Sequence, residues 1–258
     1  MAGASTLQAT AGNSALALLK LLADDTRWRL IDALRYSDYQ GGELAAQCQL
    51  PQNLVSYHLG LLRQGGLVQI HRSDVDARVV YYGLNLVGLQ RAYQQIGSAL
   101  PLPHIPTSQL PSAAVVFLCT HNSARSQIAE GWLRQLSGGR VTARSAGFEP
   151  TTLEPLAIQV MAEAGIDIGY QQAKGLDVVR NDRPNVVVTV CDRARETCHG
   201  CLDAPLQLHW SIPDPVPSAK RASDPLEAFR MARDELRVRV EGLLTALPLL
   251  TGSEQPAN

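Results

Sequence analysis

The chain has 258 residues, of which 45% are hydrophobic and 18% charged, with a formal net charge of -1. This composition is typical of a globular protein of about two domains, and the near-zero charge means that any contact with nucleic acid needs a local basic patch. No apolar run approaches the roughly 20 residues of a membrane-spanning helix, and the N-terminus does not resemble a secretory signal, so we expect a cytoplasmic protein without a membrane partner.

The first hundred residues are predicted to form helices followed by a hairpin. Leu16, Leu19 and Leu22 recur at helical spacing, and Asp24 offers an N-cap for the helix after them. Further helices are expected at Glu43–Cys48, Gln52–Gln64 and Asn85–Ile96, and strands at Leu67–His71 and Val79–Leu84.

A proline-rich segment then divides the chain. Ser98–Ser112 carries four prolines in fifteen residues, so it can be neither a central strand nor a helix interior. We therefore predict one domain at residues 1–98, a linker at 99–112 and a second domain at 113–250.

The second domain alternates strands with helices. Strands are expected at Ala114–Leu118, Val141–Ser145, Val186–Val190 and Leu206–Leu208, and helices at Ser126–Leu136, Leu153–Ala164 and from Asp224-Pro225 onwards. Such alternation predicts an α/β fold with a four-stranded parallel sheet, covered by helices and joined by right-handed crossovers.

The first strand of this domain leads into a candidate catalytic loop. Cys119 ends the strand, and Arg125 follows six residues later at the start of a helix. Arg125 can hold an oxyanion in a bidentate manner, and Ser126 can donate to the Cys119 sulfur. These surroundings are expected to lower the pKa of the Cys119 thiol below about 8.5 and so to make it a nucleophile. The loop amides are expected to converge on an anion at the helix N-terminus, and they belong to Thr120, His121, Asn122, Ser123 and Ala124.

Cys119–Gly131, which reads CTHNSARSQIAEG, resembles the phosphate loop of the low-molecular-weight tyrosine phosphatases and of the arsenate reductases that share their fold. The similarity continues through Arg144–Gly147, Val188–Cys191 and His209–Pro215. Both groups of proteins bind a tetrahedral oxyanion, so the loop does not choose between them.

The other cysteines favour the reductases. The chain has five cysteines, four of them in its second half, and such clustering indicates metal or redox chemistry rather than a framework of structural disulfides. Cys191 and Cys198 are seven residues apart, and their position and spacing resemble those of the thioredoxin-coupled arsenate reductases. Phosphatases of the fold usually carry an aromatic residue after the Asp-Pro of their acid loop, where this chain has Val216.

The resemblance implies a mechanism without a bound cofactor. Cys119 attacks arsenate, Asp214 protonates the departing oxygen, and the disulfide passes from Cys119–Cys191 to Cys191–Cys198, where thioredoxin reduces it. The polar segment between Cys191 and Cys198 is expected to be mobile. The alternatives are a tyrosine phosphatase of the same fold, or a transcription factor in which this domain senses an oxyanion or a redox state.

Three features lie outside this scheme. Cys201 forms Cys-His-Gly-Cys with Cys198, which fits a zinc half-site or a redox pair, and we expect a spare thiol rather than a metal ligand. His121 and His209 are expected to be structural. Some reductases of the fold bind potassium beside the loop; Lys174 falls where an acidic ligand would be, so we expect its ammonium group rather than an ion beside Asn122, Glu130 and Ser145.

Residues 14–97 resemble the ArsR-type winged helix-turn-helix repressors, through Leu22–Ile31, Gln52–Val68 and Arg78–Tyr82. The resemblance implies a homodimer and binding of duplex DNA, and the alternative is a helical domain kept for dimerisation. Cys48 lacks the partner cysteine of the arsenic-sensing members, so a metalloid sensor is not inferred. The expected DNA-binding side chains are Gln52, Asn53, Ser56, Tyr57, Arg63 and, in the wing, Arg78.

Overall fold

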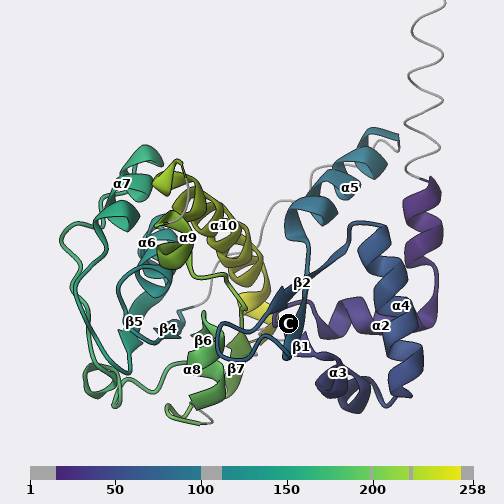
Figure 1. Cartoon of the computed structure of the whole chain (residues 1–258), viewed down its shortest axis with the longest axis horizontal. Helices are drawn as coiled ribbons and strands as arrows, with labels where there is room; N and C mark the ends of the chain where they lie inside the picture. The colour runs from purple at the N-terminus through teal and green to yellow at the C-terminus, as the bar shows by residue number, and fades with distance from the viewer. Residues whose placement is uncertain (1–15, 100–111, 198–199, 221–222, 251–258) are drawn as a thin grey trace, which may run out of the picture. The chain divides into compact units, whose positions relative to one another are not determined.

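A computed structural model describes residues 16–99, 112–197, 200–220 and 223–250 (Figure 1). The chain divides into two compact units. One is formed by Met1–Ile70 with Val80–Pro106, and the other by His71–Val79 with Thr107–Asn258. The predicted linker lies almost entirely outside the described residues.

The first unit is mainly helical and has a small sheet, as predicted. Its strands are arranged in the order β1-β3-β2, and the last two residues of β2 belong to the second unit. β1 was not predicted, because two residues carry no periodic pattern. The elements are α2 (Asp25–Ala33), β1 (Tyr39–Gln40), α3 (Gly41–Cys48), α4 (Gln52–Gln64), β2 (Val68–Arg72), β3 (Val80–Leu84) and α5 (Leu86–Ala99).

Apolar side chains at helical spacing hold the first unit together. Asp24 caps α2 by accepting the amide of Arg27 at 2.9 Å, which confirms the predicted N-cap. α4 has the predicted bounds, and it buries the face that carries Val55, Leu59 and Leu62 against a shared core.

The second unit is an α/β fold around a four-stranded sheet in the order β5-β4-β6-β7, in which all three strand pairs are parallel. α6 packs on β4 and β5, and α10 packs along α6, as Figure 1 shows. The elements are β4 (Ala114–Cys119), α6 (Arg125–Ser137), β5 (Thr142–Gly147), α7 (Pro155–Glu163), η1 (Leu176–Val178), β6 (Val186–Thr189), α8 (Asp192–Thr197), β7 (Leu206–His209), α9 (Pro215–Ala219) and α10 (Pro225–Leu250).

The strand order positions the functional residues. β4 is almost wholly buried, as expected for a central strand of a parallel sheet, and its neighbours are β5 on one side and β6 on the other. The chain therefore reverses its winding direction at β4, which creates a crevice at the carboxyl ends of the strands. Leu118 pairs with Thr189 there, so the residues that follow β4 and β6 emerge at one edge of the sheet.

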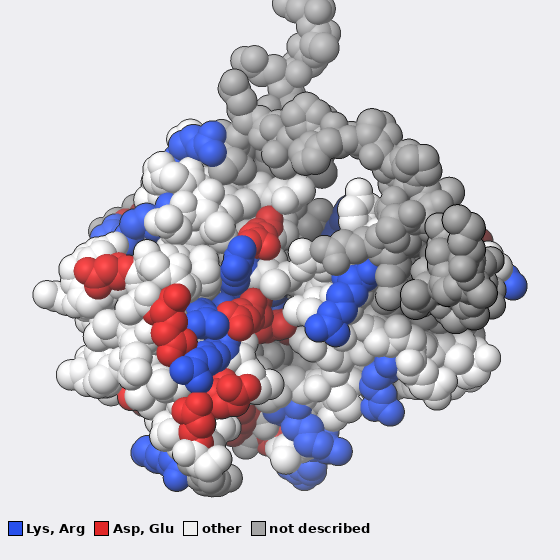
Figure 2. Space-filling view, turned by 90° about the horizontal axis from the view of Figure 1, so that it is seen from above, with Lys and Arg blue, Asp and Glu red and all other residues white. Residues whose placement is uncertain are grey.

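The formal net charge of -1 gives the chain no bulk charge of either sign. Figure 2 shows acidic and basic side chains interspersed on one face of the molecule. Within the second unit, Arg230 and Arg233 both pair with Glu163, at 2.7 and 3.1 Å. No helix among the described residues combines the length and apolar character that crossing a membrane requires.

Candidate active site

The loop after β4 surrounds the sulfur of Cys119 with donors. The amide of Asn122 donates to Cys119 Sγ at 2.9 Å, and Ser126 Oγ lies 2.9 Å from the same atom. Asn122 has φ 48°, the left-handed conformation that brings its amide round towards the sulfur. α6 then begins at Arg125, so the sulfur faces the N-terminal end of a helix, where anions are favoured.

The side chain of Asn122 fixes the loop to the rest of the fold. Its Nδ2 donates to Ser126 Oγ at 2.9 Å and to Ser145 Oγ at 2.8 Å, while its Oδ1 accepts the amide of Lys174 at 2.7 Å. Gly147 allows this close approach, because a Cβ there would lie 2.6 Å from a loop carbonyl oxygen and 2.7 Å from the amide nitrogen of Asn122. Three elements therefore converge on a single residue of the loop.

A buried carboxylate lies behind the loop. Glu130 is only 4% exposed, and it accepts a hydrogen bond from Ser145 Oγ at 2.5 Å. Lys174 Nζ lies 3.2 Å from one oxygen of Glu130, and Arg134 lies 2.7 Å from the other. The expected position of the lysine ammonium beside Glu130 and Ser145 is thus found in the structure.

Arg125 is buried and bonded on both terminal nitrogens. Its NH2 donates to Asp214 Oδ2 at 2.9 Å, and its NH1 donates to the carbonyl of Ile212 at 2.9 Å and to Asp74 Oδ2 at 3.1 Å. Asp214 also caps α9 by accepting the amide of Val216 at 3.1 Å. The guanidinium is therefore held at the loop by two carboxylates and one backbone carbonyl.

A cavity of about 360 Å³ opens above Cys119 and Arg125. His121, Ser123 and Ala124 line it on the loop side, and Asp214 lines it from the start of α9. Of the residues predicted from the sequence, Asp214 and most of the loop thus meet at one cavity, whereas Thr120 and Asn122 are not among its lining residues.

The far wall of the cavity was missed by the sequence analysis. It is formed by Thr151, Thr152 and Glu154, which follow β5. The amides of Thr151 and Glu154 donate to loop carbonyls at 3.1 and 2.9 Å. Backbone pairing of this kind leaves no signal in the side chains.

The expected depression of the Cys119 pKa is wrong. Burial and the neighbouring Cys191 raise the pKa of the Cys119 thiol, and they outweigh the hydrogen bond from Ser126, the charge of Arg125 and the amide of Asn122, which lower it. Sequence patterns show the donors but not the desolvation, which disfavours a thiolate. Burial thus favours the thiol form of Cys119 over the thiolate.

A second buried thiol lies beside the loop. Cys191 follows β6 and is 1% exposed, with its sulfur 3.5 Å from Thr120 Oγ1 and 3.4 Å from the amide of Ala194. Cys119 and Cys191 are both free, whereas Cys201 takes part in a disulfide. A disulfide sulfur is not a free thiol, so this bond fits the redox-pair alternative for Cys201 rather than the expected spare thiol. Cys198 lies outside the described residues.

The polar segment that follows Cys191 forms the short helix α8. Asp192 begins α8 and accepts hydrogen bonds from Ser211 at 2.7 Å and from His209, whose Nε2 lies 3.2 Å away. Burial raises the pKa of Asp192, but the hydrogen bonds from His209, His71 and Ser211 lower it more, so its net shift is downward. The ring of His209 also lies 2.9 Å from Thr189 Oγ1, which agrees with the structural role predicted for it.

Comparison with known proteins identifies the family of this unit. Residues 114–249 match the family model described as "Low molecular weight phosphotyrosine protein phosphatase". The chain belongs to this phosphatase family. Residues 24–69 match "Bacterial regulatory protein, arsR family", so a helix-turn-helix of that family precedes the phosphatase-family domain.

The similar proteins include several reductases. An "Arsenate reductase" of Halalkalibacterium halodurans is 35% identical over 127 residues, which cover 49% of this chain and 91% of the relative. Another, from Staphylococcus aureus, is 36% identical over 129 residues, covering 49% and 92%. A solved structure titled "An arsenate reductase in the phosphate binding state" is 31% identical, covers 52% of this chain and 98% of its own, and has a TM-score of 0.43.

The phosphatase-family unit contains one further cluster with the composition of a metal site. The possible ligand atoms of His71, Asp74 and Asp192 lie within 4.8 Å of one another. Burial lowers the pKa of His71, but the two carboxylates raise it more, to about 9. His71 lies 3.3 Å from Asp192 and 3.6 Å from Asp74, so these ion pairs account for the close approach of the three groups.

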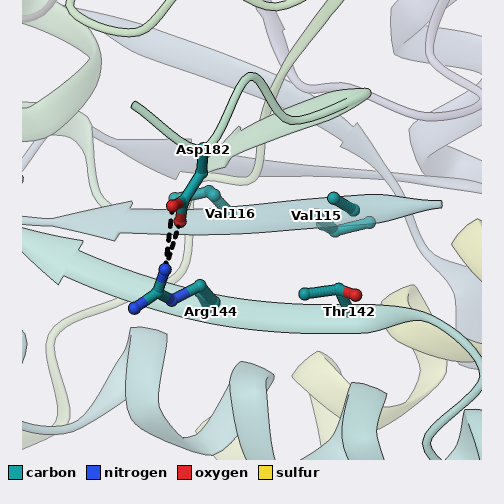
Figure 3. Close-up of a pocket in the computed structure, with 6 residues that line it drawn as sticks. Val115, Val116, Thr142, Arg144 and Asp182 are labelled. Carbon is teal, nitrogen blue, oxygen red and sulfur yellow. Dashed lines mark hydrogen bonds and ion pairs between the residues drawn. The ribbon is translucent and has the colours of Figure 1, made fainter. Parts of the chain in front are cut away.

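A second cavity of the phosphatase-family unit, of about 260 Å³, lies beside β4 and β5 (Figure 3). Arg144 extends towards Asp182 and donates to both of its oxygens, at 2.8 and 2.7 Å. Because these charges satisfy each other, the cavity has no reactive group to offer.

In the arsR-family unit, α4 presents the predicted side chains to solvent. The predicted wing residue Arg78 belongs to the second unit; it is 91% exposed but pairs with Asp76 at 2.7 Å, so its charge is partly neutralised. The predicted residues Gln52, Asn53, Ser56, Tyr57 and Arg63 are all exposed, and so is Gln64 at the end of α4.

Proposed function

We propose that the phosphatase-family domain reduces arsenate to arsenite. The observation that carries this proposal is the second buried thiol, Cys191, which lies beside the loop of Cys119. Hydrolysis of a phosphate ester needs a single nucleophile, whereas reduction of As(V) to As(III) must take two electrons from thiols. The similarity to arsenate reductases, which covers 49% of the chain, supports the same function.

The first step is substitution at arsenic. Arsenate binds at the loop and Arg125, where it takes the place of carboxylates on the guanidinium. The sulfur of Cys119 forms a bond to arsenic as one As–O bond breaks. The departing oxygen leaves as water, and it takes up the proton that the Cys119 thiol gives up. Asp214 lines the same cavity and is the group that can carry this proton.

The second step is the reduction. The sulfur of Cys191 attacks the sulfur of Cys119, and the electron pair of the S–As bond stays on arsenic. Arsenic is thereby reduced to arsenite, and the two thiols are oxidised to a Cys119–Cys191 disulfide. Cys198 then attacks Cys191: the Cys191–Cys198 bond forms, the Cys119–Cys191 bond breaks, and Cys119 leaves and takes up the proton that Cys198 loses. Thioredoxin reduces the resulting disulfide. The domain needs no bound cofactor for these steps.

Replacement of the nucleophile tests this function. Cys119→Ser should abolish arsenate reduction, because a serine hydroxyl stays protonated near neutral pH and cannot form the disulfide. Arsenite would be measured by chromatography after incubation with arsenate, thioredoxin, thioredoxin reductase and NADPH. Appreciable turnover by this variant would remove Cys119 from the mechanism.

We further propose that the arsR-family unit binds duplex DNA as a homodimer, with α4 in the major groove. The exposed amide, hydroxyl and guanidinium groups of α4 are suited to base edges and phosphates. Fluorescence anisotropy with fragments of the protein's own promoter tests this, and the absence of binding to all of them would favour a role in dimerisation alone.

A further inference from the structure

The candidate active site contains a carboxylate from outside the matched phosphatase-family region. Asp74 precedes that region, which covers residues 114–249. It lies in the segment His71–Val79, which leads from β2 to β3 and belongs to the second unit. Oδ2 of Asp74 accepts a hydrogen bond from NH1 of Arg125 at 3.1 Å. The guanidinium of the site thus has a partner that the phosphatase-family region alone does not supply.

Both terminal nitrogens of Arg125 are bonded to a carboxylate. NH2 donates to Asp214, whereas NH1 donates to Asp74 and to the carbonyl of Ile212. The two terminal nitrogens form one edge of the guanidinium, on which a carboxylate or another oxyanion can bind in a bidentate manner. An oxyanion that takes this edge must therefore compete with both carboxylates.

The segment His71–Val79 is fastened to α8, and this fixes the position of Asp74. The backbone amide of Asp74 donates to Asp192 Oδ2 at 3.1 Å, and Ser73 Oγ donates to Glu196 at 2.8 Å. A carboxylate that its own backbone holds in place loses little conformational freedom when it binds a cation. It is also present at a high effective concentration, because it belongs to the same chain as the guanidinium.

We propose that Asp74 is an intramolecular competitor of the oxyanion for Arg125 and thereby lowers the affinity of the active site for its substrate. The inference rests on the proposed function, in that it takes the cavity above Cys119 as the oxyanion site. Asp74 is not a lining residue of that cavity, so it acts through the guanidinium rather than by contact with the substrate. By linkage, a bound oxyanion weakens the bond between Arg125 and Asp74 to the same degree. Occupancy of the active site is thus transmitted to a segment that is continuous with β2 and β3.

The alternative is that Asp74 orients Arg125 and so helps it to bind the oxyanion. The carbonyl of Ile212 already holds NH1 at 2.9 Å, and it does so without a charge. A carboxylate on the guanidinium also repels an anion that binds there. Solvent screens this repulsion only in part, because the side chain of Arg125 is 9% exposed. The repulsion therefore outweighs the orientation, and removal of the Asp74 charge is expected to tighten oxyanion binding.

Titration with inorganic phosphate is the first test. Asp74→Asn keeps the shape of the side chain and removes its charge. By calorimetry, the reduced full-length variant should bind phosphate about five- to thirtyfold more tightly than the wild type, the range between an exposed ion pair and a hydrogen bond to a charged group. Asp76→Asn is the matched control, because it removes another carboxylate of the same segment, one that pairs with Arg78. Its affinity for phosphate should equal that of the wild type.

Hydrogen exchange of the segment His71–Val79 is the second readout. In the wild type, saturating phosphate should speed amide exchange in the peptide that contains Asp74, because the carboxylate then loses its cation. In Asp74→Asn the same peptide should exchange fast without phosphate, and phosphate should add nothing. Unchanged or weaker phosphate binding by Asp74→Asn would overturn the inference. So would wild-type exchange that phosphate slows or leaves unchanged.

Arsenite production by the same proteins separates this inference from the proposed function. If neither the wild type nor Asp74→Asn binds phosphate, the cavity is not an oxyanion site and the inference is wrong. If both phosphate responses are as expected but neither protein produces arsenite from arsenate, the proposed reduction is wrong, whereas competition between Asp74 and the oxyanion is supported.

Discussion

Replacement of Lys174 by methionine should loosen the catalytic loop without touching the cavity. Lys174 Nζ lies 3.2 Å from Glu130, whose other oxygen keeps Arg134 at 2.7 Å. Hydrogen bonds to charged groups contribute about 1.5–3 kcal/mol. Lys174 is 21% exposed, and Arg134 remains bonded to Glu130 in the variant. We therefore expect the free energy of unfolding to fall by about 1–2 kcal/mol, at the low end of that range. Such a loss lowers Tm by about 2–8 °C.

The loss of the Lys174 contact should also lower the rate of arsenate reduction, because Ser145 connects Glu130 to the loop of Cys119. The Ser145 hydroxyl donates to Glu130 and accepts from the side-chain amide of Asn122. The backbone amide of Asn122 in turn donates to the Cys119 sulfur. Tm by calorimetry and kcat/KM for arsenate should both fall in Lys174→Met. The matched control is Lys220→Met, which removes an exposed lysine of the same unit. Potassium chloride should restore the variant more than tetramethylammonium chloride, because a small cation can approach Glu130. If the two lysine variants behave alike, the positioning role of Lys174 is wrong.

Three further predictions concern the loop, α8 and α4. Gly147→Ala should lower kcat/KM and reduce the free energy of unfolding by about 1–3 kcal/mol, because the new Cβ would collide with the backbone of the loop. Gly242→Ala, whose Cβ would have open space around it, should cause neither loss. Asp192→Asn should flatten the acid side of the curve of Tm against pH. The Asp192 carboxylate has a lowered pKa in the folded state, so it stabilises the fold above the unfolded pKa of about 3.9 and loses that contribution as pH falls. An unchanged curve would exclude this stabilising role of Asp192. DNA affinity of the chain should fall steeply with salt, and Arg63→Ala should reduce the salt slope by about 1 if this side chain contacts phosphate, as anisotropy titrations would show.

The sequence predicted those parts of the protein in which local signals agree with the tertiary structure. α4 has the predicted bounds, because its periodic apolar face lies between Pro51 and Gly65. The contact of Cys119 with Ser126 follows from a strand that ends where a helix soon begins. The position of Lys174 beside Glu130 was expected from the resemblance and is found in the structure.

The errors have a common physical origin in tertiary context. α8 was not predicted, because its polar composition carries no apolar periodicity, whereas buried contacts of Asp192 with His209 and Ser211 fix its first residue. The pKa of Cys119 was expected to fall because the donors are visible in the sequence, whereas the burial that raises it is not. The wall of the cavity near Thr151 depends on backbone hydrogen bonds, which no motif records.

Turnover by Cys191→Ser tests the central claim, that arsenate reduction depends on a second thiol beside the nucleophile. The variant would be compared with the wild type in two assays, NADPH oxidation coupled through thioredoxin with arsenate, and hydrolysis of p-nitrophenyl phosphate. We predict that Cys191→Ser loses multiple turnover of arsenate yet keeps whatever phosphatase activity the wild type has, because Cys119 and Arg125 are untouched. Arsenate turnover equal to that of the wild type would contradict the disulfide relay.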